Sequence, residues 1–251
     1  MLLTKLIELF SENTSLSRNI NKFIILNLLI LGAILILFHF SNLDLVIQNY
    51  FYSNTHGWAI DRGNEELKLL LYVIPKKIIT YFCGLILLIC LYYSFIPGQD
   101  KNLIRAKKTL LYIFLSLLIT LTSVPMLKQA TNMHCPDSTE VFGRDKPYIK
   151  LFQKFPEEYL ADKRGKCFPA GHASAGFSLL TFFFILRQKK HRILCLIMVL
   201  TLGWIMGAYQ IMRGAHYISD TLITMMIALI SPLLCYKFIF KATKARKETK
   251  L

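Results

Sequence analysis

Six long apolar runs constrain this chain more than any other feature of its sequence. A helix needs roughly 20 apolar residues to cross the hydrocarbon core of a bilayer, with a range of about 17–25. The 251 residues are 54% hydrophobic, and ordinary soluble domains do not carry repeated runs of this length. We therefore predict an all-α, polytopic membrane protein: one domain over residues 1–251, built as a bundle of six transmembrane helices. The runs cover residues 23–40, 78–97, 109–127, 172–186, 193–211 and 219–240.

The basic residues predict how these helices are oriented. The first run is too long for a signal peptide and no Ala-x-Ala-like site follows Phe40, so we expect it to remain as an anchor. If the N-terminus is cytoplasmic, the inner segments hold 17 Lys and Arg in 54 residues and the outer segments 13 in 88. The positive-inside rule therefore places both termini in the cytoplasm and, in a bacterium, predicts the inner membrane with outer loops in the periplasm.

The net charge of +15 has the same origin. Basic inner loops contact anionic lipid headgroups, so membrane lipids are the expected partners. Nucleic-acid binding is excluded because the basic residues are split among short loops, with no continuous basic domain. No particular oligomeric state is predicted.

Five polar residues lie at the ends of the apolar runs, and the predicted topology places all of them on the outer side. Polar groups that converge at one face of an apolar bundle are more often a site than an accident. His216 and Asp220 are one helical turn apart, so the carboxylate can hold one ring nitrogen and leave the other free to attack. The alternative is structural: a snorkelling lysine and a structural His–Asp hydrogen bond. The five residues are Lys128, His172, Arg213, His216 and Asp220.

Three short motifs around these residues resemble those of the type 2 phosphatidic acid phosphatase superfamily, a group of membrane lipid phosphatases. The superfamily patterns are K-x6-R-P, P-S-G-H and S-R-x5-H-x3-D. The corresponding segments here are Lys128–Pro136, Pro169–His172 and the stretch from 210 to Asp220. Order and spacing agree, and the resemblance covers a core of roughly residues 109–240.

Each of the three motifs departs from the pattern. Cys135 replaces the arginine of the first, Ala170 the serine of the second and Gln210 the arginine of the third. Arg213 follows Gln210 by three residues, on the same face of a helix, and is the expected replacement. Further basic candidates in the outer loop are Arg144, Lys146, Arg164 and Lys166.

The resemblance implies a covalent mechanism. His216 attacks phosphorus and forms a phosphohistidine, while Asp220 orients the ring and stabilises the imidazolium. His172 protonates the leaving alkoxide and then activates water.

The resemblance also implies how phosphate is bound. Lys128 and Arg213 neutralise charge on the equatorial oxygens, with Arg144 and Lys166 as further candidates. The backbone N–H groups after Gly171 begin a helix, which favours an anion. This chemistry implies no metal and no other cofactor.

The implied activity is hydrolysis of a lipid-linked phosphate or pyrophosphate, with lipid A, phosphatidylglycerol phosphate, phosphatidate and undecaprenyl pyrophosphate as open substrates. The first alternative is a phosphotransferase that passes the phosphoryl group to a lipid acceptor. The second is a non-catalytic membrane protein that binds lipid phosphates, which the missing arginine and serine favour and the retained His–Asp pair opposes.

Two cysteines lie in the long outer loop 128–171, which we predict to form a periplasmic cap. An oxidising compartment permits a disulfide between Cys135 and Cys167, which would hold Arg144 and Lys146 over the site. A metal site is the alternative, although the spacing matches no zinc pattern. Its ligands would be His134, Cys135, Cys167 and His172.

Overall fold

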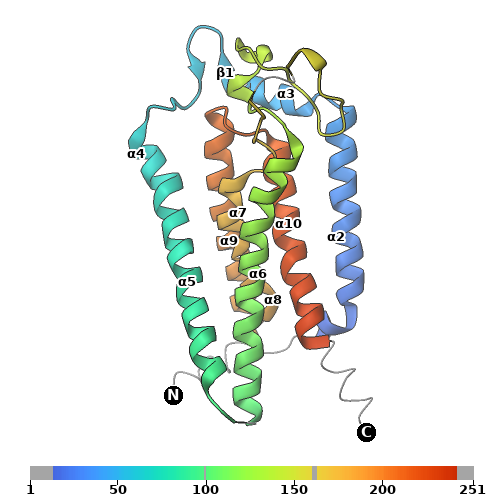
Figure 1. Ribbon diagram of the computed structural model, residues 1–251, viewed down its shortest axis with the longest axis vertical. Helices are drawn as coiled ribbons and strands as arrows, with labels where there is room; N and C mark the ends of the chain where they lie inside the picture. Colours follow the sequence, from blue (N-terminus) through green and yellow to red (C-terminus); the bar gives the residue numbers. More distant parts are fainter. Residues whose placement is uncertain (1–13, 99, 160–162, 242–251) are drawn as a thin grey trace.

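Long helices that run along one axis form the body of the molecule (Figure 1). The computed structural model describes residues 14–98, 100–159 and 163–241. Five helical segments in this part are long and apolar enough to cross a membrane, which confirms an all-α, multi-pass membrane protein. The principal helices of these segments are α2 (Thr14–Phe40), α5 (Ile74–Phe95), α6 (Lys101–Thr131), α9 (Lys189–Met212) and α10 (Ile218–Tyr236).

The fourth apolar run does not form a helix of that length, so six full-length spans are not what the structure shows. It folds into two short helices, α7 (Gly171–Ser178) and α8 (Leu180–Ile185), with a break at Leu179. Small residues let α7 pack closely on α9: a Cβ added to Gly176 would lie 2.7 Å from the Cα of Gly203. That this short, broken helix crosses the bilayer as the fourth span stays a prediction.

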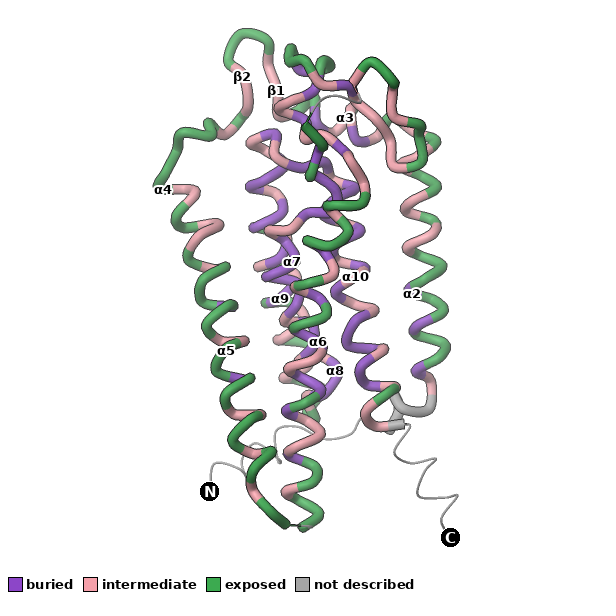
Figure 2. Tube along the Cα trace, viewed as in Figure 1, coloured by how far each residue is buried: buried purple, intermediate pink, exposed green. Residues whose placement is uncertain are grey.

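Burial separates the helices into central and outer ones (Figure 2). In the apolar stretch of α10, half of the residues are buried. In the apolar stretches of the spans that contain α2 and α5, only 11% are buried. The two outer helices keep large apolar side chains such as Leu29 and Leu88 exposed. Such a surface suits lipid rather than water, because contiguous apolar patches are rare on soluble monomers.

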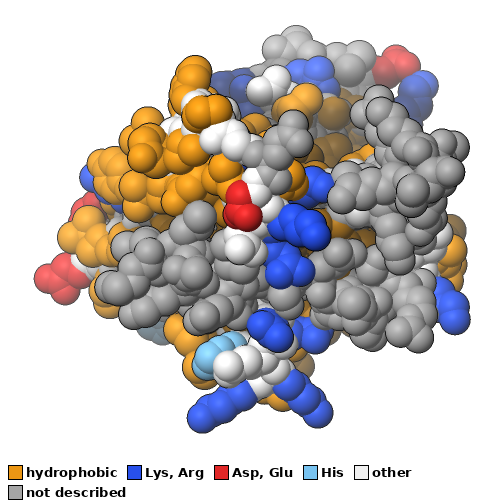
Figure 3. All heavy atoms as spheres, turned by 90° about the horizontal axis from the view of Figure 1, so that it is seen from below, with side chains coloured by type: hydrophobic (Ala, Val, Ile, Leu, Met, Phe, Trp, Pro, Cys, Tyr) orange, Lys and Arg blue, Asp and Glu red, His pale blue; other side chains and the backbone are white. Residues whose placement is uncertain are grey.

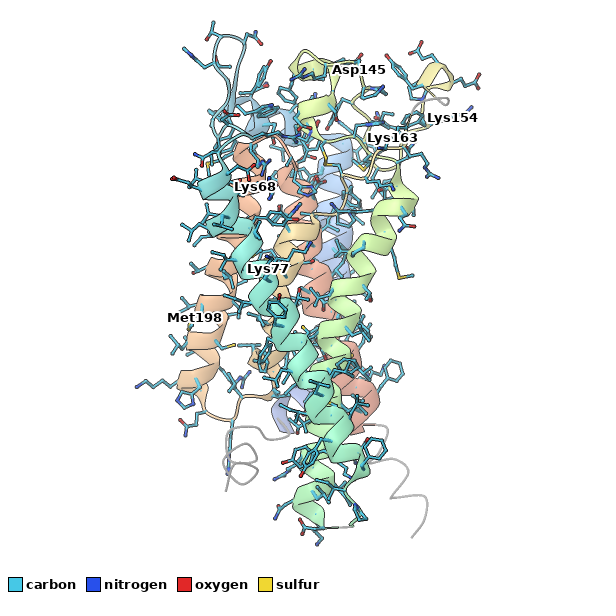
Figure 4. All side chains as sticks on the ribbon, turned by 60° about the vertical axis from the view of Figure 1, so that its left-hand side comes forward. Lys68, Lys77, Asp145, Lys154, Lys163 and Met198 are labelled. Atoms are coloured by element: carbon cyan, nitrogen blue, oxygen red, sulfur yellow. A yellow bond between two sulfur atoms is a disulfide. The ribbon has the colours of Figure 1, made fainter. Side chains whose placement is uncertain are left out.

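The short elements that connect the helices gather mainly at one end of the bundle, which we call the upper end (Figure 1). Charged side chains mark it, including Asp145, Lys154 and Lys163 of the outer loop, whereas Met198 lies on the side of α9 (Figure 4). These elements are α3 (Leu43–Asn49), the antiparallel pair β1 (Tyr52–Ser53) and β2 (Gly57–Trp58), α4 (Glu65–Lys68), the π-turn η1 (Leu69–Val73) and the 3-10 turns η2 (Pro136–Ser138), η3 (Glu140–Phe142) and η4 (Glu157–Tyr159). A second π-turn, η5 (Lys237–Lys241), follows α10.

The outer loop is shorter than predicted because α6 continues to Thr131. The helix ends at Asn132, which adopts a left-handed conformation with φ 47°. The side chain of Asn132 accepts a hydrogen bond from the backbone N–H of Gly165 (2.8 Å), and the hydroxyl of Thr131 donates to the carbonyl of Phe168 (2.9 Å). These bonds bring both ends of the loop together at the top of α6. Its role as a cap remains a prediction.

Candidate active site

Three segments that are distant in sequence bring Lys128, His172 and His216 together near the upper end of the bundle. Lys128 is in the last turn of α6, His172 is the second residue of α7, and His216 lies in the turn between α9 and α10. The Nε2 atom of His216 lies 3.4 Å from Nδ1 of His172 and 3.5 Å from Nζ of Lys128. The structure therefore places the three predicted residues around one ring nitrogen.

Asp220 holds the other nitrogen of the His216 ring. Its Oδ2 atom lies 2.9 Å from His216 Nδ1 and accepts a hydrogen bond from the backbone N–H of Tyr217 (3.1 Å). Because the carboxylate accepts, this network assigns the proton to Nδ1 and leaves a lone pair on Nε2. The contact was predicted, but its expected geometry was wrong: His216 precedes α10, and Asp220 reaches back from the first turn of that helix.

The imidazole of His216 is buried, and this affects its charge state. Burial lowers the pKa of His216 well below its ordinary value, and the positive charges of Lys128 and Arg62 lower it further. A base that stays neutral keeps its lone pair available, as a nucleophile requires.

The Pro-Ala-Gly segment is fixed between α6 and α10. The N–H of Ala170 donates to the carbonyl of Asp220 (3.2 Å), and the hydroxyl of Thr224 donates to the carbonyl of Ala170 (3.1 Å). Ala170 precedes α7 and has no side-chain cap to offer, so it leaves the first N–H groups of the helix open to an anion. Gly171 faces Lys128: an added Cβ would lie 3.2 Å from the lysine Cε and 3.4 Å from its Nζ.

Arg213 is close to the site but makes other contacts. It follows the last residue of α9 with φ −100° and ψ 10°, so the expected shared helical face with Gln210 is wrong. Its Nη1 donates to the hydroxyl of Tyr209 (3.0 Å), and its guanidinium lies over the ring of the same tyrosine. Its charge nevertheless acts on His172, which keeps it a candidate for phosphate binding.

The other basic candidates lie in the loop. Arg144 and Lys166 are exposed, and neither has a hydrogen bond or ion pair to a site histidine among the described residues. Lys146 pairs with Asp145, and Arg164 reaches the carbonyl of Ala130 (3.5 Å). Their roles in phosphate binding remain predictions.

The predicted disulfide between Cys135 and Cys167 is present, with 5.0 Å between the two Cα atoms. The sulfur of Cys167 lies 3.5 Å from His216 Nδ1 and 3.6 Å from Asp220 Oδ2. These three side chains are spaced closely enough to hold a metal ion, but a disulfide sulfur is not the thiolate that binds such an ion. The bridge likewise removes both sulfurs from the His134–His172 metal alternative.

Two further residues at the site were not predicted from sequence. Tyr72 packs edge-on against His172, with 4.3 Å between the ring centroids, and Lys76 lies over the Tyr72 ring. The charge of Lys76 acts on both Lys128 and His172. A lysine in the first turn of an apolar helix was the available signal, since such residues commonly face a polar interior.

The sequence of the chain is similar to that of a known lipid phosphatase. A lipid A 4′-phosphatase from Francisella tularensis subsp. novicida (strain U112) is 27% identical over 205 residues, which is 80% of this chain and 88% of that protein. No solved structure matches the chain. The sequence model of the PAP2 superfamily matches residues 109–244, more than half of the chain and the part that holds all three motifs. The chain therefore belongs to the PAP2 superfamily, that of the type 2 phosphatidic acid phosphatases.

Proposed function

We propose that this protein is a membrane-bound lipid phosphatase that removes phosphate from a lipid-linked phosphate or pyrophosphate through a phosphohistidine. The observation that carries the proposal is the position of His216 Nε2. This atom is free of Asp220 and has His172 at 3.4 Å and Lys128 at 3.5 Å. A nucleophile, a proton donor and a cation are thereby within reach of one phosphoryl group.

The proposed reaction has two steps. Nε2 of His216 forms a bond to phosphorus while the bond to the lipid oxygen breaks, and His172 gives its proton to that oxygen. In the second step, His172 takes a proton from a water molecule. The water oxygen attacks phosphorus, the bond from phosphorus to Nε2 breaks, and inorganic phosphate is released. Asp220 stabilises the positive charge on the His216 ring in between.

Cations stabilise the transferred group. Lys128 is aimed at Nε2 from one side, and the open N–H groups at the start of α7 adjoin Lys128 through Gly171. Positive charge that is already in place acts on the transition state without reorganisation, which is commonly the largest contribution in phosphoryl transfer.

The lipid A head group is the first substrate to test, because the related protein from Francisella is named for that phosphate. A site near the outer end of the helices suits a head group in the outer leaflet. Lys and Arg side chains gather at the opposite end (Figure 3). Lys101, Arg105 and Lys108, from the first turns of α6, line one pocket. This distribution supports a cytoplasmic lower end and a periplasmic site in an inner membrane.

The decisive experiment measures phosphate release by the purified protein from lipid A, phosphatidylglycerol phosphate, phosphatidate and undecaprenyl pyrophosphate. His216→Ala is the control for contaminating activity. Release of inorganic phosphate that depends on His216 supports the proposal. Recovery of the phosphoryl group on a second lipid would instead identify a phosphotransferase, and binding without turnover of any substrate would identify a non-catalytic protein.

A further inference from the structure

A second guanidinium lies beside the position of the missing arginine. Arg62, in the first outer loop, forms an ion pair through Nη2 with the carboxylate of Asp137. Asp137 follows Cys135, the residue that replaces the first-motif arginine, by two positions. The Asp137 side chain is 9% exposed and that of Arg62 49% exposed, so the carboxylate is nearly buried while the arginine side chain is half-exposed.

The chain around Arg62 is attached directly to the third motif. The N–H of Ile60 donates to the carbonyl of Met212 (3.2 Å), and the indole of Trp58 lies against Gly214. Gly214 has φ +70° and no room for a Cβ, so only glycine suits that position.

The turn that carries Asp137 is attached to the same place. The N–H of Asp137 donates to the carbonyl of Gly214 (3.0 Å), two residues before His216. The aromatic rings of Trp58 and Phe142, from the first and second outer loops, lie 5.0 Å apart and hold the two loops together. Arg62 is therefore held near His216 by the segment that precedes it and by the turn that carries its ion-pair partner.

Positive charge is in excess around this arginine. Burial lowers the pKa of Arg62, and the charges of Arg213 and Arg144 lower it further. The charge of Arg62 also reaches His216. Among the ion pairs of the described residues, Asp137 is the carboxylate that pairs with one of these three arginines, Arg62. The three positive charges therefore exceed the negative charge beside them. An added anion is the natural complement of this excess.

We propose that Arg62 is a phosphate-binding residue of this site, with Asp137 as its positioning residue, and that it supplies the guanidinium absent at Cys135. The ligand is the phosphoryl group of a lipid-linked phosphate, so the inference rests on the proposed function. A guanidinium carries five N–H donors in a planar fork. The ion pair through Nη2 leaves other N–H donors for phosphate oxygens, and the side chain is half-exposed.

The alternative is that the Arg62–Asp137 ion pair only holds two loops together, a structural role that we call a latch. Arg62→Gln and Asp137→Asn break the same ion pair from its two sides, so a latch predicts equal losses. Phosphate binding predicts that kcat/KM for lipid phosphate falls about 10²–10³-fold in Arg62→Gln, the usual effect of removing one transition-state donor. Asp137→Asn should lose less than about tenfold, and Arg62→Lys should fall between them because it keeps the charge without the fork.

Inhibition by orthovanadate gives a readout that a latch would not change. The inhibition constant should rise at least about tenfold in Arg62→Gln and by a clearly smaller factor in Asp137→Asn, which keeps the guanidinium but loses the group that positions it. Lys68→Gln is the matched control, because it breaks an exposed pair with Glu65 in the same outer segment. Thermal midpoints of all variants separate these effects from unfolding. Equal losses in Arg62→Gln and Asp137→Asn, with unchanged vanadate inhibition, would overturn the inference.

The inference can also be tested if the proposed function fails. Should the wild-type protein release no phosphate from any lipid, orthovanadate can still be tested as a stabilising ligand in a thermal shift assay. Stabilisation of the wild type that is lost in Arg62→Gln and kept in Asp137→Asn supports an anion site at Arg62. The same stabilisation in all three proteins, or in none, rules it out.

Discussion

Nζ of Lys128 lies 3.5 Å from Nε2 of His216, the ring nitrogen that Asp220 leaves free. The contact joins the first and third motifs across 88 positions of the sequence. In the proposed mechanism, the lone pair of Nε2 attacks phosphorus, and the ammonium donates toward it. A phosphoryl group would take over this donor and free the lone pair at the same moment. Under the proposed function, Lys128 would therefore couple phosphate binding to activation of the nucleophile.

The first prediction concerns the nucleophile and its partner. His216→Ala should remove turnover by a factor of about 10⁶ because the covalent step has no substitute, whereas Asp220→Asn should cost nearer 10⁴. Single-turnover phosphate release measures both, and an unchanged thermal midpoint shows that each variant is folded. Full activity in folded His216→Ala would exclude the phosphohistidine.

The second prediction uses the contact between Gly171 and Lys128. In Gly171→Ala, the new methyl group lies 3.2 Å from Lys128 Cε and 3.4 Å from Nζ, so the lysine must move by a few tenths of an ångström. We expect kcat/KM to fall roughly 10–10²-fold, since small misplacements of positioned groups are costly. Gly84→Ala is the matched control because its Cβ would meet nothing within 4 Å. Equal activity of the two variants would show that the position of Lys128 is not critical.

The third prediction concerns the pH dependence of stability. Asp44 of α3 accepts bonds from the N–H (3.1 Å) and hydroxyl (2.6 Å) of Ser219, at the start of α10. Burial raises the pKa of Asp44 to about 7; the charge of Asp220 adds to this, while the bonds from Ser219 and the charge of Lys150 oppose it. A raised pKa means that the folded state binds the proton more tightly. Asp44 therefore stabilises the fold below its ordinary pKa of 3.8, and this contribution is lost as pH rises toward 7.

Asp44→Asn resembles the neutral carboxyl group and isolates this effect. From pH 4 to 7.5, the thermal midpoint of the wild type should fall relative to the variant, by the equivalent of a few kcal/mol at about 1.4 kcal/mol per pKa unit. His216 has the opposite sign: its lowered pKa destabilises the fold as pH falls below its ordinary 6.5. The wild type and Asp44→Asn share this contribution of His216, so it cancels when their thermal midpoints are subtracted. Parallel curves for the two proteins would refute the prediction.

The fourth prediction concerns the disulfide, which joins residues 32 positions apart. In the chain-entropy model, a bridge of this length contributes about 3–4 kcal/mol to the free energy of unfolding. Cys135→Ser with Cys167→Ser should lower the thermal midpoint accordingly and reduce phosphate release, because Cys167 contacts His216 and Asp220. Cys83→Ala, which changes a free cysteine, is the control. Stability and activity that match this control would show that the bridge is dispensable.

The fifth prediction concerns metal ions. Phosphate release should survive exhaustive EDTA treatment, since lysine and arginine supply the positive charge and the bridged cysteines offer no thiolate. Activity is measured before and after dialysis against the chelator. A loss that added zinc or magnesium restores would point instead to a metal-dependent reaction.

The sequence predicted the meeting of Lys128, His172 and His216 because each follows or begins an apolar run at the end predicted to face outward. It predicted the Cys135–Cys167 disulfide for the same reason. The alternation of helix direction is enough to bring such ends together, whereas the conformations of the turns are not. Hence the His216–Asp220 contact was predicted correctly and its geometry was not.

Arg62 could not be found in this way. It lies in a loop between the first two spans, without periodicity or a motif, and its position depends on how Trp58 packs against Gly214. The break at Leu179 could not be predicted either, because a short apolar run looks the same in sequence whether it forms a full span or a buried, interrupted helix. Both features result from tertiary packing between segments distant in sequence.

The amide of Gln48, at the end of α3, is buried and donates to the carbonyl of Ile211 (2.8 Å), near the end of α9. Together with Asp44 at Ser219, it makes the N-terminal quarter of the chain a scaffold for the turn that carries His216. That quarter lies outside the segment shared with the superfamily, residues 109–244. Substitutions of Asp44 or Gln48 would shift this turn while every motif residue is retained. The position of His216 therefore depends on residues that the superfamily model does not cover, and a comparison of motifs alone would overlook them.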